Sequence, residues 1–411
     1  MRVTTLVGLA VLFAATNQVV PQAQAPARSL PPISPTPQAS VTTLASRLEL
    51  ERYKATVKGL TQFGDRRQGT ERNRKAVDWI QAQLESYGCP TERIKYTYNP
   101  PPPAPRPPAA SQNRPAEPAI PRAVGGGRPR GIRTPTGVNA DPQKQPNDAL
   151  RALNAEPATN GPREEVYCTK VGSKYPNEMY IVSAHMDGHG WGEAANDDGS
   201  GTALVMELAR VFSMPDVQTE RTIRFALWNN EETGLNGAAA YVEQRKALQG
   251  KETPAGSGKF PEPTWLGMIQ HDMMMFDHGM PRADGTIPPE QRPEADVNIE
   301  FQMTAKQTLG AQALAWFFHA ANEKYATDYP AQVGPHMTNT DSTPFMDEVP
   351  AISLRENERG VHVGSGWDPQ WHQPTDVFAT YSDKDFRLGL NAAQTTLGAV
   401  GELTGATVVA R

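Results

Sequence analysis

The sequence has no block of basic residues, and this absence limits the partners that the protein can bind. Its 40 lysines and arginines are outnumbered by 45 aspartates and glutamates, so the formal net charge is -5 at pH 7. A nucleic-acid-binding surface needs clustered cations that neutralise phosphates. We therefore predict no nucleic-acid partner.

Long apolar runs are also missing once the N-terminal segment is set aside. A bilayer-spanning helix needs ~20 consecutive apolar residues, and residues 26–411 contain no such stretch. We therefore expect no membrane contact after removal of the N-terminal segment. The sequence carries no signal for a particular oligomeric state, which is unknown at this stage.

The N-terminal segment itself has the three parts of a signal peptide. Arg2 supplies a positive start, residues 3–15 are nearly all apolar, and Ala-Gln-Ala at 23–25 is a small-x-small cleavage site. A membrane anchor is the alternative, but the apolar run is shorter than a bilayer requires. We predict a signal peptide over 1–25 and a secreted or periplasmic protein.

Cysteine is scarce, because only Cys89 and Cys168 occur. Export permits a disulfide between them, and two buried thiols are the alternative. We favour the bridge, because a strand at 166–170 that returns antiparallel to a strand at 93–98 would bring Cys168 close to Cys89.

Composition divides the remaining chain. Residues 26–45 are rich in Pro, Ser, Thr and Gln and read as a flexible spacer or short pro-segment. One folded domain is expected over 46–411, interrupted at 99–162 by a Pro/Gly-rich segment with few large apolar residues. Such a segment buries too little apolar surface to offset its ordering entropy. We predict that this insertion is mostly disordered.

Strands and helices alternate through the domain. Period-two and buried apolar runs predict strands, and apolar residues at helical spacing predict helices. Alternating elements favour an α/β fold with three αβα layers and a mixed, mostly parallel central sheet. The expected strands are 93–98, 166–170, 179–184, 222–228, 265–270, 297–303 and 351–354, and the expected helices are 71–87, 201–212, 237–244, 305–325 and 383–403.

Metal-ligand side chains follow three of these strands. His185 and Asp187 follow strand 179–184, Glu231 and Glu232 follow strand 222–228, and Asp272 follows strand 265–270. The carboxyl ends of parallel strands share one edge of a sheet, where open α/β sheets bind their ligands. We therefore expect these side chains to lie close together.

Two more ligand candidates come from loops. Asp197 precedes helix 201–212, and His372 lies in Trp-His-Gln-Pro-Thr-Asp at 371–376. Zinc takes imidazole nitrogen and carboxylate oxygen, and two zincs that share one carboxylate need about two further ligands each. One His–Glu pair and one Asp–His pair around a shared Asp would satisfy this count, which predicts two Zn²⁺ per chain.

Four segments occur in the order of a known family. They are His-Met-Asp-Gly at 185–188, Ala-Asn-Asp-Asp-Gly-Ser-Gly at 195–201, Trp-Asn-Asn-Glu-Glu-Thr-Gly-Leu at 228–235 and the late Trp-His-Gln-Pro-Thr-Asp. Together they resemble the co-catalytic zinc exopeptidases of the aminopeptidase S and aminopeptidase Y type, metallopeptidase family twenty-eight. Thr-Asp-Ser-Thr-Pro-Phe at 340–345 resembles that family's Ser-Asp-His-x-x-Phe stretch. The resemblance covers 46–98 and 164–405.

The resemblance implies how the ligands divide. Asp197 would bridge both metals. His185 and Glu232 would complete one zinc site, and Asp272 and His372 would complete the other. No other cofactor is expected.

The resemblance also implies two catalytic residues. Glu231 would be the general base and later the general acid, and Asp187 would hydrogen-bond His185 and fix its tautomer. Many relatives carry a tyrosine directly before the late histidine, where this sequence has Trp371. The implied reaction is hydrolysis of the N-terminal bond of a peptide substrate with a free N-terminus, through a zinc-bridging water.

Two alternatives stay open. A zinc carboxypeptidase or dipeptidase of the same fold needs a cation for the substrate carboxylate, and Arg355 or Arg359 could supply it. A non-catalytic binding module is the other alternative, although such a module would be expected to lose ligands or Glu231.

Neighbouring residues receive lesser roles. Asp198 is expected to shape the backbone of Asp197 rather than to bind metal. His189, His271 and His278 are expected to lie behind the ligands or on the surface. Met273, Met274 and Met275 are expected to pack beneath the site.

Overall fold

The computed structural model describes residues 38–100, 137–276, 297–335, 339–356 and 368–409. The signal peptide predicted for 1–25, Arg359 and His278 lie outside these residues. Among the helices of the described residues, none combines the length and apolarity that crossing a membrane requires.

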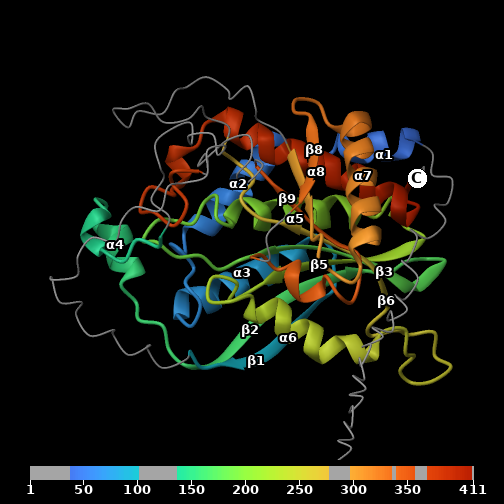
Figure 1. The fold of residues 1–411 in the computed structure, drawn as a ribbon, viewed down its shortest axis with the longest axis horizontal. Coiled ribbons are helices and arrows are strands. Elements are labelled where there is room, and N and C mark those ends of the chain that lie inside the picture. Colours follow the sequence, from blue (N-terminus) through green and yellow to red (C-terminus); the bar gives the residue numbers. More distant parts are fainter. Residues whose placement is uncertain (1–37, 101–136, 277–296, 336–338, 357–367, 410–411) are drawn as a thin grey trace, which may run out of the picture.

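Eight strands form one central sheet (Figure 1). They are β1 (Thr91–Tyr98), β2 (Gly161–Lys170), β3 (Tyr175–His185), β5 (Arg221–Trp228), β6 (Thr264–His271), β7 (Val297–Phe301), β8 (Ala331–Pro335) and β9 (Ala351–Arg355). Their order is β1-β2-β5-β3-β6-β9-β7-β8. The four central strands β5, β3, β6 and β9 are parallel, whereas β1, β2 and β7 pair antiparallel to their inner neighbours. The predicted mixed, mostly parallel sheet is confirmed.

Most helices cover one face of this sheet (Figure 1). They are α1 (Gln38–Ala45), α2 (Leu50–Thr61), α3 (Glu71–Ser86), α5 (Gly199–Phe212), α7 (Thr308–Tyr325) and α8 (Asp383–Thr404). Their buried side chains form one large hydrophobic core with that face. The other face is covered mainly by α6 (Asn236–Arg245), whose Tyr241 and Val242 pack in a smaller core with Trp228 and Trp265. The three-layer architecture is therefore confirmed, with unequal outer layers.

Local signals explain where the covering helices begin and end. Thr70 caps α3 by accepting from Asn73 N at 3.1 Å. Ser382 and Asp385 form a capping box at the start of α8, and Gly405 ends this helix in the left-handed conformation. Two short strands, β4 (Val217–Gln218) and β10 (Thr407–Val408), then pair at the C-terminal end of the chain.

The prediction of a flexible spacer over 26–45 is wrong for residues 38–45, which form α1. Val41 and Leu44 of this helix are fully buried, and the helix packs against α8 and β10. The polar composition of the segment hides two apolar residues three positions apart, which suffice for one buried helical stripe. Residues 26–37 lie outside the described part of the chain.

The predicted disordered insertion is also wrong for its C-terminal part. Residues 142–144 form a 3₁₀ turn, and α4 (Asp148–Asn154) follows. Gln145 Nε2 donates to the carbonyls of Trp191 and Pro374, both at 2.8 Å, and Asn154 Nδ2 donates to Gly192 O at 2.7 Å. Side-chain hydrogen bonds rather than apolar burial order this segment, and composition does not report them.

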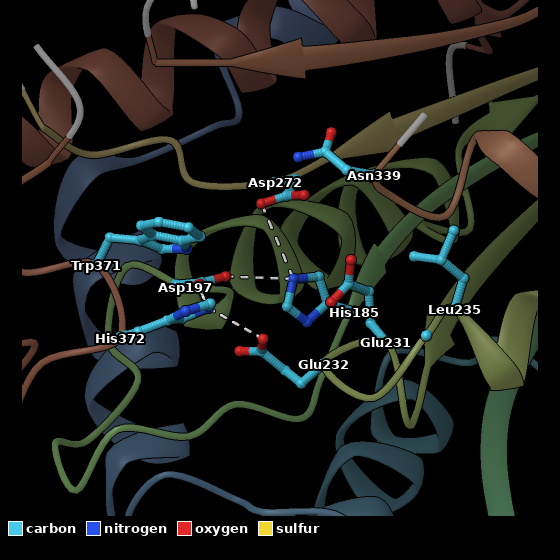
Figure 2. Close-up of a pocket in the computed structure, with 10 residues that line it drawn as sticks. His185, Asp197, Glu231, Glu232, Leu235, Asp272, Asn339, Trp371 and His372 are labelled. Atoms are coloured by element: carbon cyan, nitrogen blue, oxygen red, sulfur yellow. Dashed lines mark ion pairs between the residues drawn. The ribbon is translucent and has the colours of Figure 1, made fainter. Parts of the chain in front are cut away.

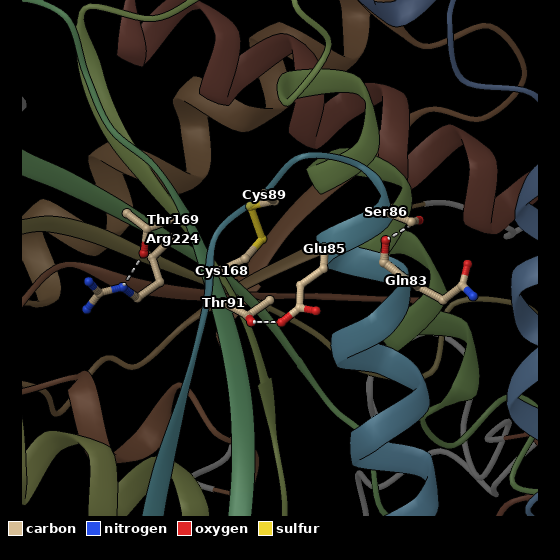
Figure 3. Close-up of a disulfide and its surroundings, with 8 residues drawn as sticks. All are labelled: Gln83, Glu85, Ser86, Cys89, Thr91, Cys168, Thr169 and Arg224. Atoms are coloured by element: carbon tan, nitrogen blue, oxygen red, sulfur yellow. Dashed lines mark hydrogen bonds between the residues drawn. A yellow bond between two sulfur atoms is a disulfide. The ribbon is translucent and has the colours of Figure 1, made fainter.

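A disulfide joins β2, the second strand of the sheet, to the segment that follows α3 (Figure 3). Cys89, three residues after α3, is bonded to Cys168 in β2, with 5.6 Å between the Cα atoms. The antiparallel register pairs Thr91 with Cys168. The predicted bridge is confirmed.

Candidate metal and catalytic site

The predicted site residues converge at the carboxyl edge of the central strands (Figure 2). His185 ends β3, Asp272 follows β6, and Glu231 and Glu232 follow β5. Asp197 lies two residues before α5. Register pairs His185 with Trp228 on one side and Ala184 with His271 on the other. These residues line a cavity of about 400 Å³, together with Leu235, Asn339, Trp371 and His372.

One group of donor atoms surrounds His185. Its Nε2 lies 3.3 Å from Asp197 Oδ1 and 3.9 Å from Asp272 Oδ1. Glu231 belongs to the same cluster, because one donor atom each of His185, Glu231 and Asp272 lie within 4.8 Å of one another. His185 is oriented by its Nδ1, which lies 3.0 Å from the carbonyl oxygen of Asp187.

A second group surrounds His372. Its Nε2 lies 2.9 Å from Asp197 Oδ2 and 3.0 Å from Glu232 Oε2. His189 joins this group, with its Nε2 2.9 Å from the same Glu232 oxygen. Asp197 thus contacts both histidines, one with each carboxylate oxygen.

The ligand pairing implied by the resemblance is wrong. His185 lies with Asp272, not with Glu232, and His372 lies with Glu232, not with Asp272. The reason is the path of the late loop. The segment after β3 holds this loop near Glu232, because Glu193 N donates to Asp376 O at 2.7 Å.

The donor set suits two divalent cations. Within the described residues, Glu232 Oε1 and Asp197 Oδ2 are buried and have no hydrogen-bond partner. The two groups together contain four carboxylates and three imidazoles, and buried charges of one sign require opposite charges or a metal. Burial lowers the pKa of His372, but Glu232 and then Asp197 outweigh it and raise the pKa to about 10. A bound metal would take the place of such a proton.

The carboxylate of Asp187 acts on Glu231 rather than on His185. Its Oδ1 lies 3.9 Å from His185 Nδ1 but accepts the backbone N–H of Glu231 at 3.0 Å. Only the main-chain carbonyl of Asp187 contacts the His185 ring. The predicted tautomer-fixing contact exists, but the carboxylate does not make it. Burial raises the pKa of Asp187 to about 6.

Asp198 connects the three ligand-bearing segments. Its carboxylate accepts from Gly201 N at 2.8 Å, from His185 N at 3.2 Å and from Met273 N at 3.2 Å. It therefore caps α5 and joins that helix to the ends of β3 and β6. The Asp197–Asp198 peptide is cis.

Two residues that support Asp272 were not predicted. Thr340 Oγ1 donates to Asp272 Oδ2 at 2.6 Å, and Arg355 Nη2 donates to the same oxygen at 2.7 Å. Arg355 is buried and also lies 3.6 Å from Glu300. Opposite charges at the ends of neighbouring parallel strands could have suggested the Arg355–Asp272 pair, because Arg355 ends β9 and Asp272 directly follows β6.

The neighbouring residues lie as expected, with one exception. His271 is buried behind the site, where its Nδ1 lies 3.0 Å from Ser183 O and its Nε2 2.8 Å from Thr396 Oγ1. Met273, Met274 and Met275 are buried. The exception is His189, which reaches the ligand cluster.

Comparisons with known proteins show the family of the chain and its fold. The model of Peptidase family M28 matches residues 165–394, more than half of the chain, and the chain belongs to this family of metallopeptidases. It is 39% identical to carboxypeptidase Q of Xenopus laevis over 92 residues, which is 22% of this chain and 20% of that protein. It is 34% identical to aminopeptidase YwaD of Bacillus subtilis over 115 residues, which is 28% of this chain and 24% of that protein.

The sequence matches are short, because they span only 20% and 24% of the lengths of these relatives. The fold match is longer. BSAP, a zinc aminopeptidase from Bacillus subtilis, superposes with a TM-score of 0.57 at 14% identity, over 89% of this chain and 98% of that chain. This likeness shows a shared fold.

Proposed function

We propose that this protein is an exported di-zinc aminopeptidase that hydrolyses the N-terminal bond of peptides with a free N-terminus. The observation that carries the proposal is the position of Asp197, which contacts His185 with one oxygen and His372 with the other. This bridging position, with Glu231 beside the first group, is the arrangement that two-metal hydrolysis requires.

Each residue has a defined part. His185 and Asp272 would hold one zinc, Glu232 and His372 the other, and Asp197 both. When bound, the zinc pair supplies Lewis acidity towards the substrate carbonyl and lowers the pKa of water. Burial, with the neighbouring carboxylates, raises the pKa of Glu231 well above its usual range.

Glu231 is placed to move the proton. It lines the cavity and its backbone is fixed by Asp187. Glu231 takes a proton from the attacking water and returns it to the leaving amine, so one carboxylate serves both half-steps. Leu235 and Trp371 offer apolar walls for the substrate side chain.

A zinc carboxypeptidase or dipeptidase is the second candidate, and the identity with carboxypeptidase Q favours it. Its requirement is a cation that meets the substrate carboxylate. Arg355 does not meet this requirement, because it is buried against Asp272 and Glu300. The first candidate needs no such cation.

Paired substrates distinguish the two candidates. Amino-acid p-nitroanilides and C-blocked dipeptides should be hydrolysed, while N-blocked dipeptides should not. Glu231→Gln should lower kcat by ~10²–10⁴-fold and leave the zinc content at two ions per chain. Turnover of N-blocked peptides would favour the carboxypeptidase, and full activity after complete zinc removal would overturn both candidates.

Metal content also addresses the binding-module alternative. Two zincs per chain together with turnover that depends on Glu231 would exclude it. Export is tested separately, by N-terminal sequencing of the secreted or periplasmic protein, which should begin at residue 26.

A further inference from the structure

His189 lies among the metal-binding side chains, although no family motif includes it. One donor atom each of His189, Glu232 and His372 lie within 4.8 Å of one another. The rings of His189 and His372 are perpendicular, with centroids 4.1 Å apart. Both imidazoles thus approach the same carboxylate oxygen, His189 at 2.9 Å and His372 at 3.0 Å.

The contact between His189 and Glu232 is short but lacks the alignment of a good hydrogen bond. Despite the 2.9 Å separation, His189 Nε2 is a buried atom without a hydrogen-bond partner in the part of the chain that the structure describes. Asp197 Oδ2 and Glu232 Oε1 share this property. Buried polar atoms without a hydrogen-bond partner call for an explanation such as a bound ion. Three such atoms belong to this one group of side chains, so a shared cation would satisfy them together.

The backbone next to His189 is built to hold it there. Gly190 has φ +100°, and a Cβ at this position would lie 2.5 Å from the main-chain carbon and oxygen of His372. Only glycine allows the two loops to approach this closely. Asn139 reinforces the approach, because its N–H donates to His372 O at 3.0 Å and its side chain lies 3.5 Å from Gly190 O.

We propose that His189 is a protein ligand of the metal held by Glu232, His372 and Asp197. The inference rests on the proposed di-zinc site and makes its two metal positions unequal. One metal would have four protein ligands, namely His189, Glu232, His372 and Asp197. The other would have three, namely His185, Asp272 and the shared Asp197. Structural zinc sites are closed by four protein ligands, whereas catalytic ones keep an open position. The metal with three protein ligands is the one beside Glu231.

Cobalt substitution tests this ligand without measuring activity. In the full chain loaded with Co²⁺, each histidine bound through one nitrogen leaves a ring N–H whose proton resonance is strongly shifted by the metal. The wild-type protein should show three such exchangeable signals, and His189→Gln should show two. His319→Gln, which removes a histidine on the outer surface of α7 near Glu323, should keep three.

Chelator competition gives a second measurement. One of the two ions should bind more than about 100-fold more weakly in His189→Gln, since loss of a ligand exceeds the 10–100-fold cost of an outer partner. The other ion should be unaffected. Two ions with only two shifted signals in the wild-type protein would overturn His189 as a ligand while leaving the di-metal site intact. Fewer than two ions in the wild-type protein would overturn the di-metal site itself.

Discussion

The candidate metal site and the cluster around Arg224 both bury charged side chains, but the buried charges are paired in different ways. Arg224 lies in β5 and donates to Glu262 Oε2, and Glu262 also accepts from the Tyr241 hydroxyl at 2.7 Å and from the Trp265 indole N–H. No atom of Arg224 or Glu262 is a buried atom without a partner. In the metal site, carboxylate oxygens of Asp197 and Glu232 lack such partners.

The presence or absence of partners for the buried charges distinguishes a structural cluster from a candidate functional site. A buried ion pair with every donor and acceptor occupied needs nothing from outside the chain, so it stabilises one packing arrangement. A buried group of carboxylates with too few donors requires external cations. Binding those cations contributes free energy to folding as well as chemistry to the site.

The largest expected effect comes from metal removal. Complete chelation should abolish peptidase activity and lower the free energy of unfolding, by ~4 kcal/mol for each ion present at ~1,000 times its Kd. Thermal unfolding with and without chelator measures this change, and re-addition of zinc should reverse it. Equal melting temperatures with and without metal would contradict the view that the carboxylates need external cations.

A substitution in the cluster around Arg224 should destabilise the protein without changing its metal content. Glu262→Gln leaves the Arg224 guanidinium buried without its carboxylate, which should cost ~3–5 kcal/mol of unfolding free energy. Urea unfolding measures the loss, and zinc content should stay at two ions. Glu71→Gln is the matched control, because the Glu71–Arg74 pair is 55% and 52% exposed and should change stability by less than ~1 kcal/mol.

The sequence predicted which side chains lie together in the candidate site better than it predicted how they pair. Residues at strand ends, such as His185 and Asp272, are predictable because local apolar runs mark the strands and the shared carboxyl edge follows from parallel pairing. Pairing of ligands depends on where the loop of His372 returns, and long-range hydrogen bonds such as Glu193 to Asp376 fix that position. No local pattern encodes such contacts.

The same distinction explains the other differences from prediction. Helix α1 is held by Val41 and Leu44, which are buried in the contact with α8. That contact joins opposite ends of the domain sequence. The segment around Gln145 and Asn154 is ordered by carbonyl groups of loops far away in the sequence. Nothing in the sequence shows that Gly190 brings the loop of His189 against His372.

Asp187 tests whether the site depends on the hydrogen bond that holds the backbone of Glu231. Asp187→Ala removes the acceptor of the Glu231 N–H and should lower kcat roughly 10–100-fold, the usual cost of an outer partner. Zinc affinity should change little, because His185 contacts the carbonyl of residue 187 rather than its side chain. Asp187→Asn keeps an acceptor oxygen and should lose less activity. If Asp187→Ala instead releases zinc while kcat of the reloaded protein is normal, the carboxylate acts on His185.

The smallest expected effect concerns Asp272, a proposed ligand whose carboxylate already accepts hydrogen bonds from the protein. Its Oδ2 accepts from both Thr340 and Arg355, so in this respect it resembles the cluster around Arg224. Thr340→Val removes one donor at nearly constant volume and leaves Arg355 in place. A hydrogen bond to a charged group contributes ~1.5–3 kcal/mol. Because Arg355 still donates to the carboxylate, we expect the lower end of this range, which weakens zinc affinity by about tenfold. Competition with a chelator of known affinity measures the change.

Thr343→Val is the matched control for this substitution. The Thr343 hydroxyl is buried and has no hydrogen-bond partner in the described structure, so its removal should leave zinc affinity unchanged. Equal weakening in the two variants would mean that the 340–345 segment acts through packing and not through its donor. Weakening in Thr340→Val alone would show that one uncharged hydroxyl, placed against an already paired carboxylate, still tunes the metal site.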